Sequence, residues 1–448
     1  MVGRFSTVYC LGRVLMVLIA VIALTSTITP TFGIERISVT TDGAQGAGNA
    51  YAPSVTRDGN LVAFTSEAAN LVARDTNGVR DIFLRDRPMG RTTRESVGLI
   101  GPSNGGSYCP AISADGRYLA FASSAGNLVP GDSNGATDIF VRDREAGKVE
   151  RISVANDGVQ ANAPSFAPAI SADGRFVVFF SRASNLVRGD SNGKMDVFVR
   201  EWKAGQTSRV SVSTDGKQGN RDSWGPAISA DGCCVAFYSA ASNLIANDTN
   251  GADDVFVHDL RTAQTERVSM ASDGTQGNGH SGKYGEIVAL YGGISLSADA
   301  RHVAFISKAS NLVAGDTNDN WDVFVNDRQN GATTRVSIST DGAQANGWSW
   351  SPLISADGHW VAFSSRASNL VAGDTNGRTD VFIHDRESSQ TVRVSVADDG
   401  AQANGDCGGA ALSANGQLVA FESWASNLVP DDTNRREDVF ITHNPLAR

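Results

Sequence analysis

A loop that could bind calcium occurs seven times in the chain. Each copy has an aspartate, a threonine or serine, an asparagine, usually a glycine, and then a second aspartate shortly before an apolar strand. Calcium binds six to eight oxygen atoms, which alternate oxygen-bearing side chains around a sharp turn can supply. The candidate ligands are Asp75, Asn77, Asp81, Asp132, Asn134, Asp138, Asp190, Asn192, Asp196, Asp248, Asn250, Asp254, Asp316, Asn318, Asp322, Asp374, Asn376, Asp380, Asp432, Asn434 and Asp438.

The same loops have a second interpretation that needs no metal. Aspartate and asparagine side chains accept hydrogen bonds from their own backbone in turns, and glycine supplies a positive φ. Two carboxylates in each loop are few for tight calcium binding. We therefore favour a structural role for the loops, with calcium as the alternative, and predict no other cofactor.

Five aromatic residues recur at one position of the repeat and could contact a ligand. They are Tyr51, Tyr108, Phe166, Trp224 and Trp350, and each stands shortly before an apolar residue such as Val55 or Ile112. Aromatic faces bind sugars, peptides and cations. The alternative is that these rings pack against one another and fill the space between repeats.

One segment breaks the spacing of the repeat. The interval from Asp248 to Asp316 is longer than the interval from Asp316 to Asp374, so a short segment has been added within the first of them. The added segment carries His280 and Lys283, which are candidate ligand-binding residues. A tolerated surface insertion is the alternative. A smaller departure is the sequence Asp406-Cys-Gly-Gly before the last repeat.

The elements that position these residues are short strands. Pro168 to Val212 reads as four strands with Gly- and Asp-rich connections, and seven such units follow one another. Valine and phenylalanine recur at fixed places, as in Val62 and Phe64, and predict packing between units. The sequence therefore predicts an all-β seven-bladed propeller of four-stranded antiparallel blades. Because the last unit lacks a fourth strand, we expect Ile34 to Val39 to complete it and close the ring, which removes an exposed edge.

The connections differ in length in a way that distinguishes two faces of the ring. The first-to-second and third-to-fourth turns are short, whereas the other two connections run to about a dozen residues. In an up-and-down blade the two long connections emerge on the same face. Long loops on a rigid scaffold usually carry function, so we expect any binding site on this long-loop face.

Residues 1–33 are expected to be a signal peptide or N-terminal anchor, with the propeller in residues 34–448. Arg4 and Arg13 precede a short apolar run, Val14 to Leu24, that small and polar residues follow. The run is short for a membrane span, so we expect none after cleavage.

The net charge of −10 and pI of about 5.1 argue against a nucleic-acid partner. The cysteines of the mature chain show no disulfide pattern.

The repeat resembles a known family. The phrase Pro168 to Arg175, a strand ending in Val-Ala-Phe and a later Asp-Val-Phe-Val are similar to the TolB-type propeller repeat. The resemblance covers nearly all of the chain from Ile34 onwards and implies a propeller fold. TolB proteins are typically periplasmic, combine six blades with an N-terminal domain, and bind envelope proteins. This chain has seven units and no room for that domain, so their binding role is not transferred.

These observations favour an exported, monomeric propeller, periplasmic or secreted, that binds a protein, peptide or glycan on its long-loop face. The alternative is a hydrolase or lyase with carboxylates at the mouth of the channel, and a third interpretation is a calcium-stabilised structural module. No catalytic residue is predicted, because Gly-x-Ser-x-Gly occurs only outside the strand-to-helix turn that it needs and no His-Glu-x-x-His is present.

Overall fold

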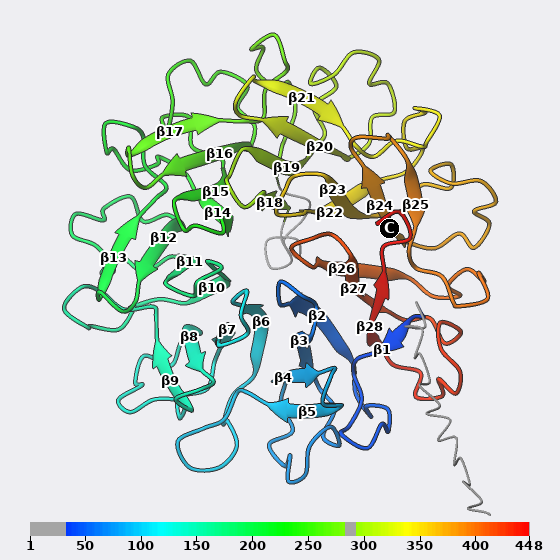
Figure 1. The fold of residues 1–448 in the computed structure, drawn as a ribbon. Coiled ribbons are helices and arrows are strands. Elements are labelled where there is room, and N and C mark those ends of the chain that lie inside the picture. The colour runs from blue at the N-terminus through cyan, green and yellow to red at the C-terminus, as the bar shows by residue number, and fades with distance from the viewer. Residues whose placement is uncertain (1–32, 283–292, 448) are drawn as a thin grey trace, which may run out of the picture. The chain divides into compact units, whose positions relative to one another are not determined.

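In a computed structural model, which describes residues 33–282 and 293–447, the chain forms seven four-stranded antiparallel sheets. The sheets are arranged as blades around a central axis (Figure 1). This confirms the predicted all-β seven-bladed propeller. Over the described residues there is no helix, so none is present there that is long and apolar enough to cross a bilayer.

Each blade runs from an inner first strand to an outer fourth strand, and blades 1 to 7 follow chain order. The first strands are β2 (Ala50–Val55), β6 (Ser107–Ile112), β10 (Ser165–Ile170), β14 (Ser223–Ile228), β18 (Ile294–Leu296), β22 (Ser349–Ile354) and β26 (Cys407–Leu412). The second strands are β3 (Leu61–Ser66), β7 (Tyr118–Ser123), β11 (Phe176–Ser181), β15 (Cys234–Ser239), β19 (His302–Ser307), β23 (Trp360–Ser365) and β27 (Leu418–Ser423). The third strands are β4 (Asp81–Asp86), β8 (Asp138–Asp143), β12 (Asp196–Glu201), β16 (Asp254–Asp259), β20 (Asp322–Asp327), β24 (Asp380–Asp385) and β28 (Asp438–His443). The fourth strands are β5 (Arg91–Arg94), β9 (Lys148–Arg151), β13 (Gln206–Arg209), β17 (Gln264–Arg267), β21 (Ala332–Arg335), β25 (Thr391–Arg393) and, in blade 7, β1 (Glu35–Arg36).

The leading segment closes the ring as the sequence predicted. Strand β1 pairs antiparallel with β28, with Glu35 opposite Ile441 and Arg36 opposite Phe440. The backbone N–H of Ile37 then donates to the carbonyl of Val439 at 2.7 Å. Seen in Figure 1, the first and last parts of the described chain therefore lie in one blade.

The fourth strands are shorter than the sequence predicted, and the segment Ile34 to Val39 is an instance. The regular strand ends at an arginine, such as Arg36 or Arg94, and only one further backbone bond follows, as from Glu95 N–H to the carbonyl of Ile82 at 2.7 Å. At the serine that follows, a side chain takes the place of the backbone acceptor, because Ser96 Oγ accepts from the backbone N–H of Ile82 at 3.0 Å and donates to the buried carboxylate of Asp81 at 2.5 Å. The same bond forms from Ser38 to Asp438 in blade 7.

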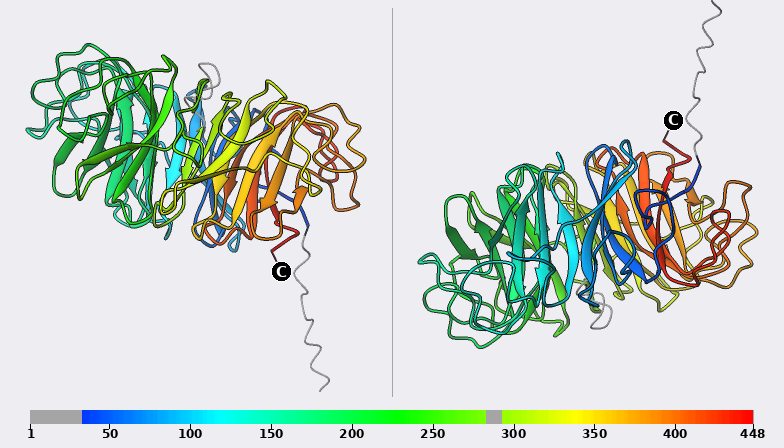
Figure 2. Two further views of the ribbon diagram at one scale, coloured as in Figure 1. Left: turned by 90° about the horizontal axis from the view of Figure 1, so that it is seen from above. Right: turned by 90° about the horizontal axis from the view of Figure 1, so that it is seen from below.

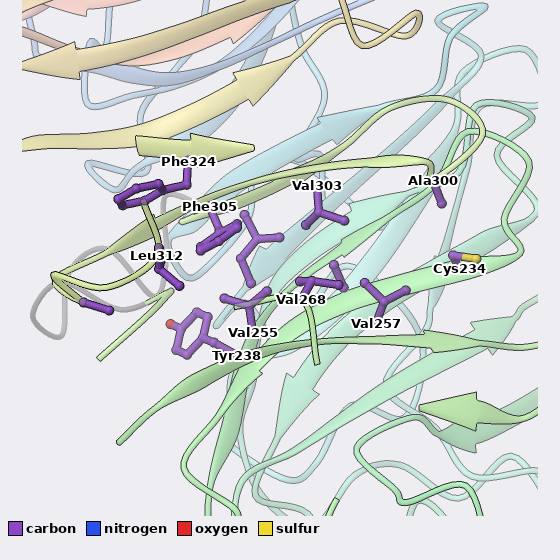
Figure 3. Close-up of a cluster of buried hydrophobic side chains, with 13 residues drawn as sticks. Cys234, Tyr238, Val255, Val257, Val268, Ala300, Val303, Phe305, Leu312 and Phe324 are labelled. Carbon is purple, nitrogen blue, oxygen red and sulfur yellow. The ribbon is translucent and has the colours of Figure 1, made fainter. Parts of the chain in front are cut away.

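The core lies between blades and is built from the repeated phenylalanines. Phe64 of β3 faces Phe83 of β4, their ring centroids lie 5.9 Å apart, and both are fully buried. Figure 3 shows one such cluster, in which Phe305 and Phe324 of blade 5 pack with residues of blade 4 that include Tyr238. The repeated phenylalanines therefore hold neighbouring blades together, as predicted.

The long connections share one face, as expected. Ala50, at the start of β2, pairs with Ser66 at the end of β3, and Ser66 pairs with Asp81 at the start of β4. The side views in Figure 2 show that the strands run between two faces that carry loops. Hydrogen bonds join the long loops to one another, since the side chain of Asn70 donates to the carbonyl of Gln45 at 3.0 Å.

The first strands line a central cavity of about 340 Å³ and share an irregularity near its mouth. In six blades the register shifts after the second residue of the strand, at a position with positive φ: Ala52, Cys109, Ala167, Gly225, Ser351 and Gly409. Such a β-bulge leaves one residue outside the ladder. In blade 5 the added residues enter at this same point, between Gly282 and Gly293.

Candidate functional site

The candidate calcium loops are occupied by an arginine in every blade. The arginine ends the fourth strand, and its guanidinium lies between the two aspartates of the loop. In blade 1, Nη1 of Arg94 is 2.8 Å from Asp75 and 3.5 Å from Asp81. The equivalent arginines, 3.0–3.9 Å from their aspartates, are Arg36, Arg151, Arg209, Arg267, Arg335 and Arg393.

The second aspartate of each loop is a buried hydrogen-bond centre. Asp322 accepts from the amide of Asn318 at 2.8 Å and from the hydroxyl of Ser337 at 2.6 Å, and Arg335 is 3.6 Å away. Burial raises the pKa of Asp322 to about 6, and the hydrogen bonds and the arginine oppose this shift. The oxygens that a metal would need therefore already have partners within the protein.

This geometry supports the structural interpretation of the loops. In the described residues no three His, Cys, Asp or Glu side chains are grouped as metal ligands would be. Calcium binding stays a prediction for thermal unfolding to test. The role of the arginine was missed in the sequence, although the signal was present, because an arginine recurs two residues before a serine in every fourth-strand segment, as in Arg209 and Ser211.

The five predicted aromatics lie at equivalent places on the first strands, at the long-loop end. Each has packing or polar partners from its surroundings. Trp224 stacks on Tyr238 with centroids 5.3 Å apart, and the hydroxyl of Tyr108 bonds that of Thr137 at 2.8 Å. Trp350 lies 6.0 Å from the guanidinium carbon of Arg366. These contacts favour packing for most of the set, and whether any of them binds a ligand stays a prediction.

The candidates in the added segment are only partly described. Lys283 lies outside the described residues. Nδ1 of His280 accepts a hydrogen bond from the backbone N–H of Asp253 at 3.0 Å, and its side chain is 57% exposed. Asp406 occupies the equivalent position in blade 7 and accepts from Thr379 N–H at 2.9 Å. His280 therefore supports a loop in the described structure, and whether it also binds a ligand stays a prediction.

Blade 7 breaks the symmetry at the aromatic position. Here the first strand has Gly408, and the residue opposite it on β27 is Glu422. Apart from chain neighbours, a Cβ atom placed at Gly408 would have only two described atoms within 4 Å, Oγ of Ser364 at 3.8 Å and Oε1 of Glu422 at 4.0 Å. In blade 5 the equivalent Gly282 is instead filled by Tyr238, since its Cβ would lie 2.6 Å from that of Tyr238.

The missing side chain opens a cavity between blades 6 and 7 on the long-loop face. The cavity has a volume of about 380 Å³, within the range of ligand pockets. Its lining combines acidic, aromatic and basic side chains: Glu422, Glu437, Asp406, Trp350, Trp424 and Arg366. Trp424 is 50% exposed, which is unusual for so large an apolar side chain.

The two glutamates of the cavity influence each other. Burial raises the pKa of Glu437, and the neighbouring Glu422 raises it further, while a hydrogen bond from the Trp424 side chain opposes the shift. Burial also raises the pKa of Glu422, whose Oε2 accepts from the backbone N–H of Ala52 in blade 1 at 2.8 Å. When two neighbouring carboxyl groups are not ionised at the same time, the protonated one can donate a hydrogen bond to a ligand and the ionised one can accept one.

Sequence reasoning located the edge of this cavity but not its centre. Asp406-Cys-Gly-Gly was recognised as a departure from the repeat, and Trp350 was a candidate. Glu422 and Glu437 were missed. Aligning each second strand with its copies would have found Glu422, since the equivalent residues are Thr65, Ala122, Phe180, Tyr238, Ile306 and Ser364.

Comparison with known proteins identifies similar folds at low sequence identity. TolB from Acinetobacter baumannii is 16% identical, with a TM-score of 0.40, and the match covers 78% of this chain and 64% of TolB, under two thirds of its length. Oligogalacturonate lyase from Vibrio parahaemolyticus is 12% identical, with a TM-score of 0.53 and coverage of 92% and 94%. The β-propeller domain of the Trilobed protease from Pyrococcus furiosus, which has an open velcro topology, is 11% identical, with a TM-score of 0.52 and coverage of 88% and 95%.

No family model matches the sequence, and no curated protein matches it. At these identities the structural likeness shows the fold alone. The chain is therefore a seven-bladed β-propeller that shares its fold with a lyase and a protease domain, and its own ring is closed by β1 and β28.

Proposed function

We propose that this protein is an exported binding propeller that takes a protein, peptide or glycan on its long-loop face. The observation that carries the proposal is the cavity between blades 6 and 7. Six blades fill this position with a side chain, or with a neighbour's, and blade 7 leaves it open beside Glu422. A scaffold built from near-identical blades gains nothing in packing from one open position.

The test is a binding screen followed by mapping of the bound face. The purified chain is screened on a glycan array and against a random peptide library, and the strongest ligand is mapped by amide hydrogen exchange. We expect protection in the long connections, such as residues 67–80, and none in short turns, such as residues 87–90. Protection confined to the short-turn face, or no ligand above background, would overturn the proposal.

Export rests on the predicted signal peptide, which lies outside the described residues. Expression of the full chain should yield a protein in the periplasm or medium whose mass lacks roughly the first 30 residues. Full-length protein retained in the cytoplasm would count against export.

The carboxyl pair also favours a second candidate, a hydrolase or lyase. A protonated and an ionised carboxyl in one cavity is an arrangement that acid–base catalysis uses. Ligands from the screen should therefore be incubated with the protein and analysed by mass spectrometry. Fragments that form with wild type and not with Glu437→Gln would establish the enzyme, whereas intact ligand supports binding alone.

A further inference from the structure

From the cavity between blades 6 and 7 we infer that the ligand presents an uncharged pyranose ring, so that the partner is a neutral glycan. The inference rests on the proposed function and names its ligand class. Its observations are the shape of the opening, the polar atoms that face it, and the charges around it.

The opening has the size of a ring. Five blades place an aromatic ring at the position of Gly408, and no described atom of this chain takes that place in blade 7. Trp350 and Trp424 both line the cavity. The C–H faces of a pyranose pack on aromatic side chains. A ring-shaped ligand would therefore replace the missing side chain.

The atoms nearest to the vacant Cβ position at Gly408 are polar, which distinguishes a sugar from an aromatic peptide side chain. Ser364 is fully buried, and its hydroxyl has no hydrogen-bond partner among the described residues. That hydroxyl and Oε1 of Glu422 are the two atoms nearest to the position of the absent Cβ. An apolar ring would leave both unpaired and out of water, which is unfavourable. The hydroxyl groups around a pyranose would pair with them.

The charges around the opening disfavour an anionic sugar. Glu422, Glu437 and Asp406 line the cavity, and Arg366 is the basic residue among its described lining. Because burial already raises the pKa of Glu422 and Glu437, the ionised carboxylate of a uronic acid would be disfavoured there for the same reason, and Asp406 beside it would add repulsion. A lysine side chain would be attracted, but it would leave the ring-sized opening unfilled.

The test is a calorimetric titration of the full chain with five probes. Cellohexaose, maltohexaose and chitohexaose are uncharged, hexagalacturonate is anionic, and hexalysine is cationic. We expect at least one uncharged hexasaccharide to bind, and hexagalacturonate to bind at least tenfold more weakly. No binding of the three uncharged probes, or stronger binding of hexalysine or hexagalacturonate in the cavity, would overturn the inference.

Two pairs of variants locate the binding. Ser364→Ala should weaken it about threefold to tenfold, as expected for one hydrogen bond, without lowering Tm, because the hydroxyl has no described partner to lose. Thr65→Val is the matched control, since Thr65 is an equivalent buried hydroxyl without a described partner in blade 1. Gly408→Trp should weaken binding more than tenfold, and Gly126→Trp, on an exposed loop of blade 2, should not.

If a saccharide binds equally to Ser364→Ala, Gly408→Trp and wild type, the cavity is not its site and the inference fails. The proposed function survives that result if hydrogen exchange still places the ligand on the long-loop face. The proposed function is overturned together with the inference only if no ligand binds to the long-loop face. A folded Ser364→Ala protein gives a decision even where Gly408→Trp does not fold.

Discussion

Ile37 provides a quantitative test of how the ring is closed. Its side chain is fully buried and packs against blades 7 and 1, in a cluster that includes Val62 and Ile441. Truncation of a buried isoleucine to alanine lowers the free energy of unfolding by about 2–5 kcal/mol. With an unfolding entropy of about 2.1 cal/mol/K per residue, the roughly 400 residues of the ring give about 0.9 kcal/mol/K. Ile37→Ala should therefore lower Tm by about 2–6 °C.

Ile152 is the matched control for this experiment. It is the equivalent residue of blade 2, is 1% exposed, and its N–H donates to the carbonyl of Ile139 at 2.7 Å. Its strand follows β8 through a short turn, whereas β1 is held to β28 without a connecting turn. Both variants should lower Tm similarly in calorimetry, but Ile37→Ala alone should markedly speed amide exchange in residues 34–40.

The closure argument would be refuted by one clear outcome. If Ile37→Ala shifts Tm by less than about 1 °C while Ile152→Ala gives the expected decrease, the leading segment contributes little to the ring. Equal exchange rates at residues 34–40 in wild type and in Ile37→Ala would argue the same way.

Three further predictions concern the loops and the cavity. The raised pKa of Asp322, about 6 against an ordinary 3.8, means that the folded protein holds this proton to higher pH than the unfolded chain. The free energy of unfolding of wild type relative to Asp322→Asn should be highest below about pH 4 and fall as pH rises through about 6, and urea titrations at several pH values that give a flat difference would contradict this. Because an arginine bridges the aspartates of every loop, millimolar calcium or EDTA should leave Tm within about 1 °C, and a rise with calcium that EDTA reverses would favour the metal interpretation. Gly409→Ala should lower the free energy of unfolding by about 1–3 kcal/mol, since its Cβ would lie 2.4 Å from the carboxyl carbon of Glu422; an unchanged Tm would show that this carboxyl is free to move.

The fold could be predicted because the same four-strand pattern occurs seven times in the sequence. A phenylalanine such as Phe64 or Phe83 at the same place in each copy has one simple explanation, packing between blades, and strand order follows from the turns. The ends of the fourth strands could not be predicted. They depend on whether the backbone N–H of Ile82 donates to a backbone carbonyl or to the hydroxyl of Ser96, and that hydroxyl is held in place by the carboxylate of Asp81, which only the fold brings beside it.

The candidate site was predictable only in part, for a related reason. Residues that recur in every blade are identified as structural by their recurrence. A binding site consists of residues that differ from the repeat, and a single such difference is hard to distinguish from neutral sequence variation. Gly408 was visible as a missing aromatic. Glu422 lies on β27 and Glu437 directly precedes β28, and only the fold places both of them against one cavity.

The bulge near the mouth of the channel has a consequence for engineering. At this point the chain has already left its hydrogen-bonding ladder, so additional residues can enter without breaking strand pairs. Blade 5 is the natural instance, since a Cβ at Gly293 would lie 2.4 Å from the carbonyl oxygen of Gly282, which means that the chain departs and returns at almost one spot. Ala52 and Ala167 offer the same opportunity in blades 1 and 3. Peptides grafted there would surround a common opening, which makes this scaffold suited to displaying several foreign segments at once.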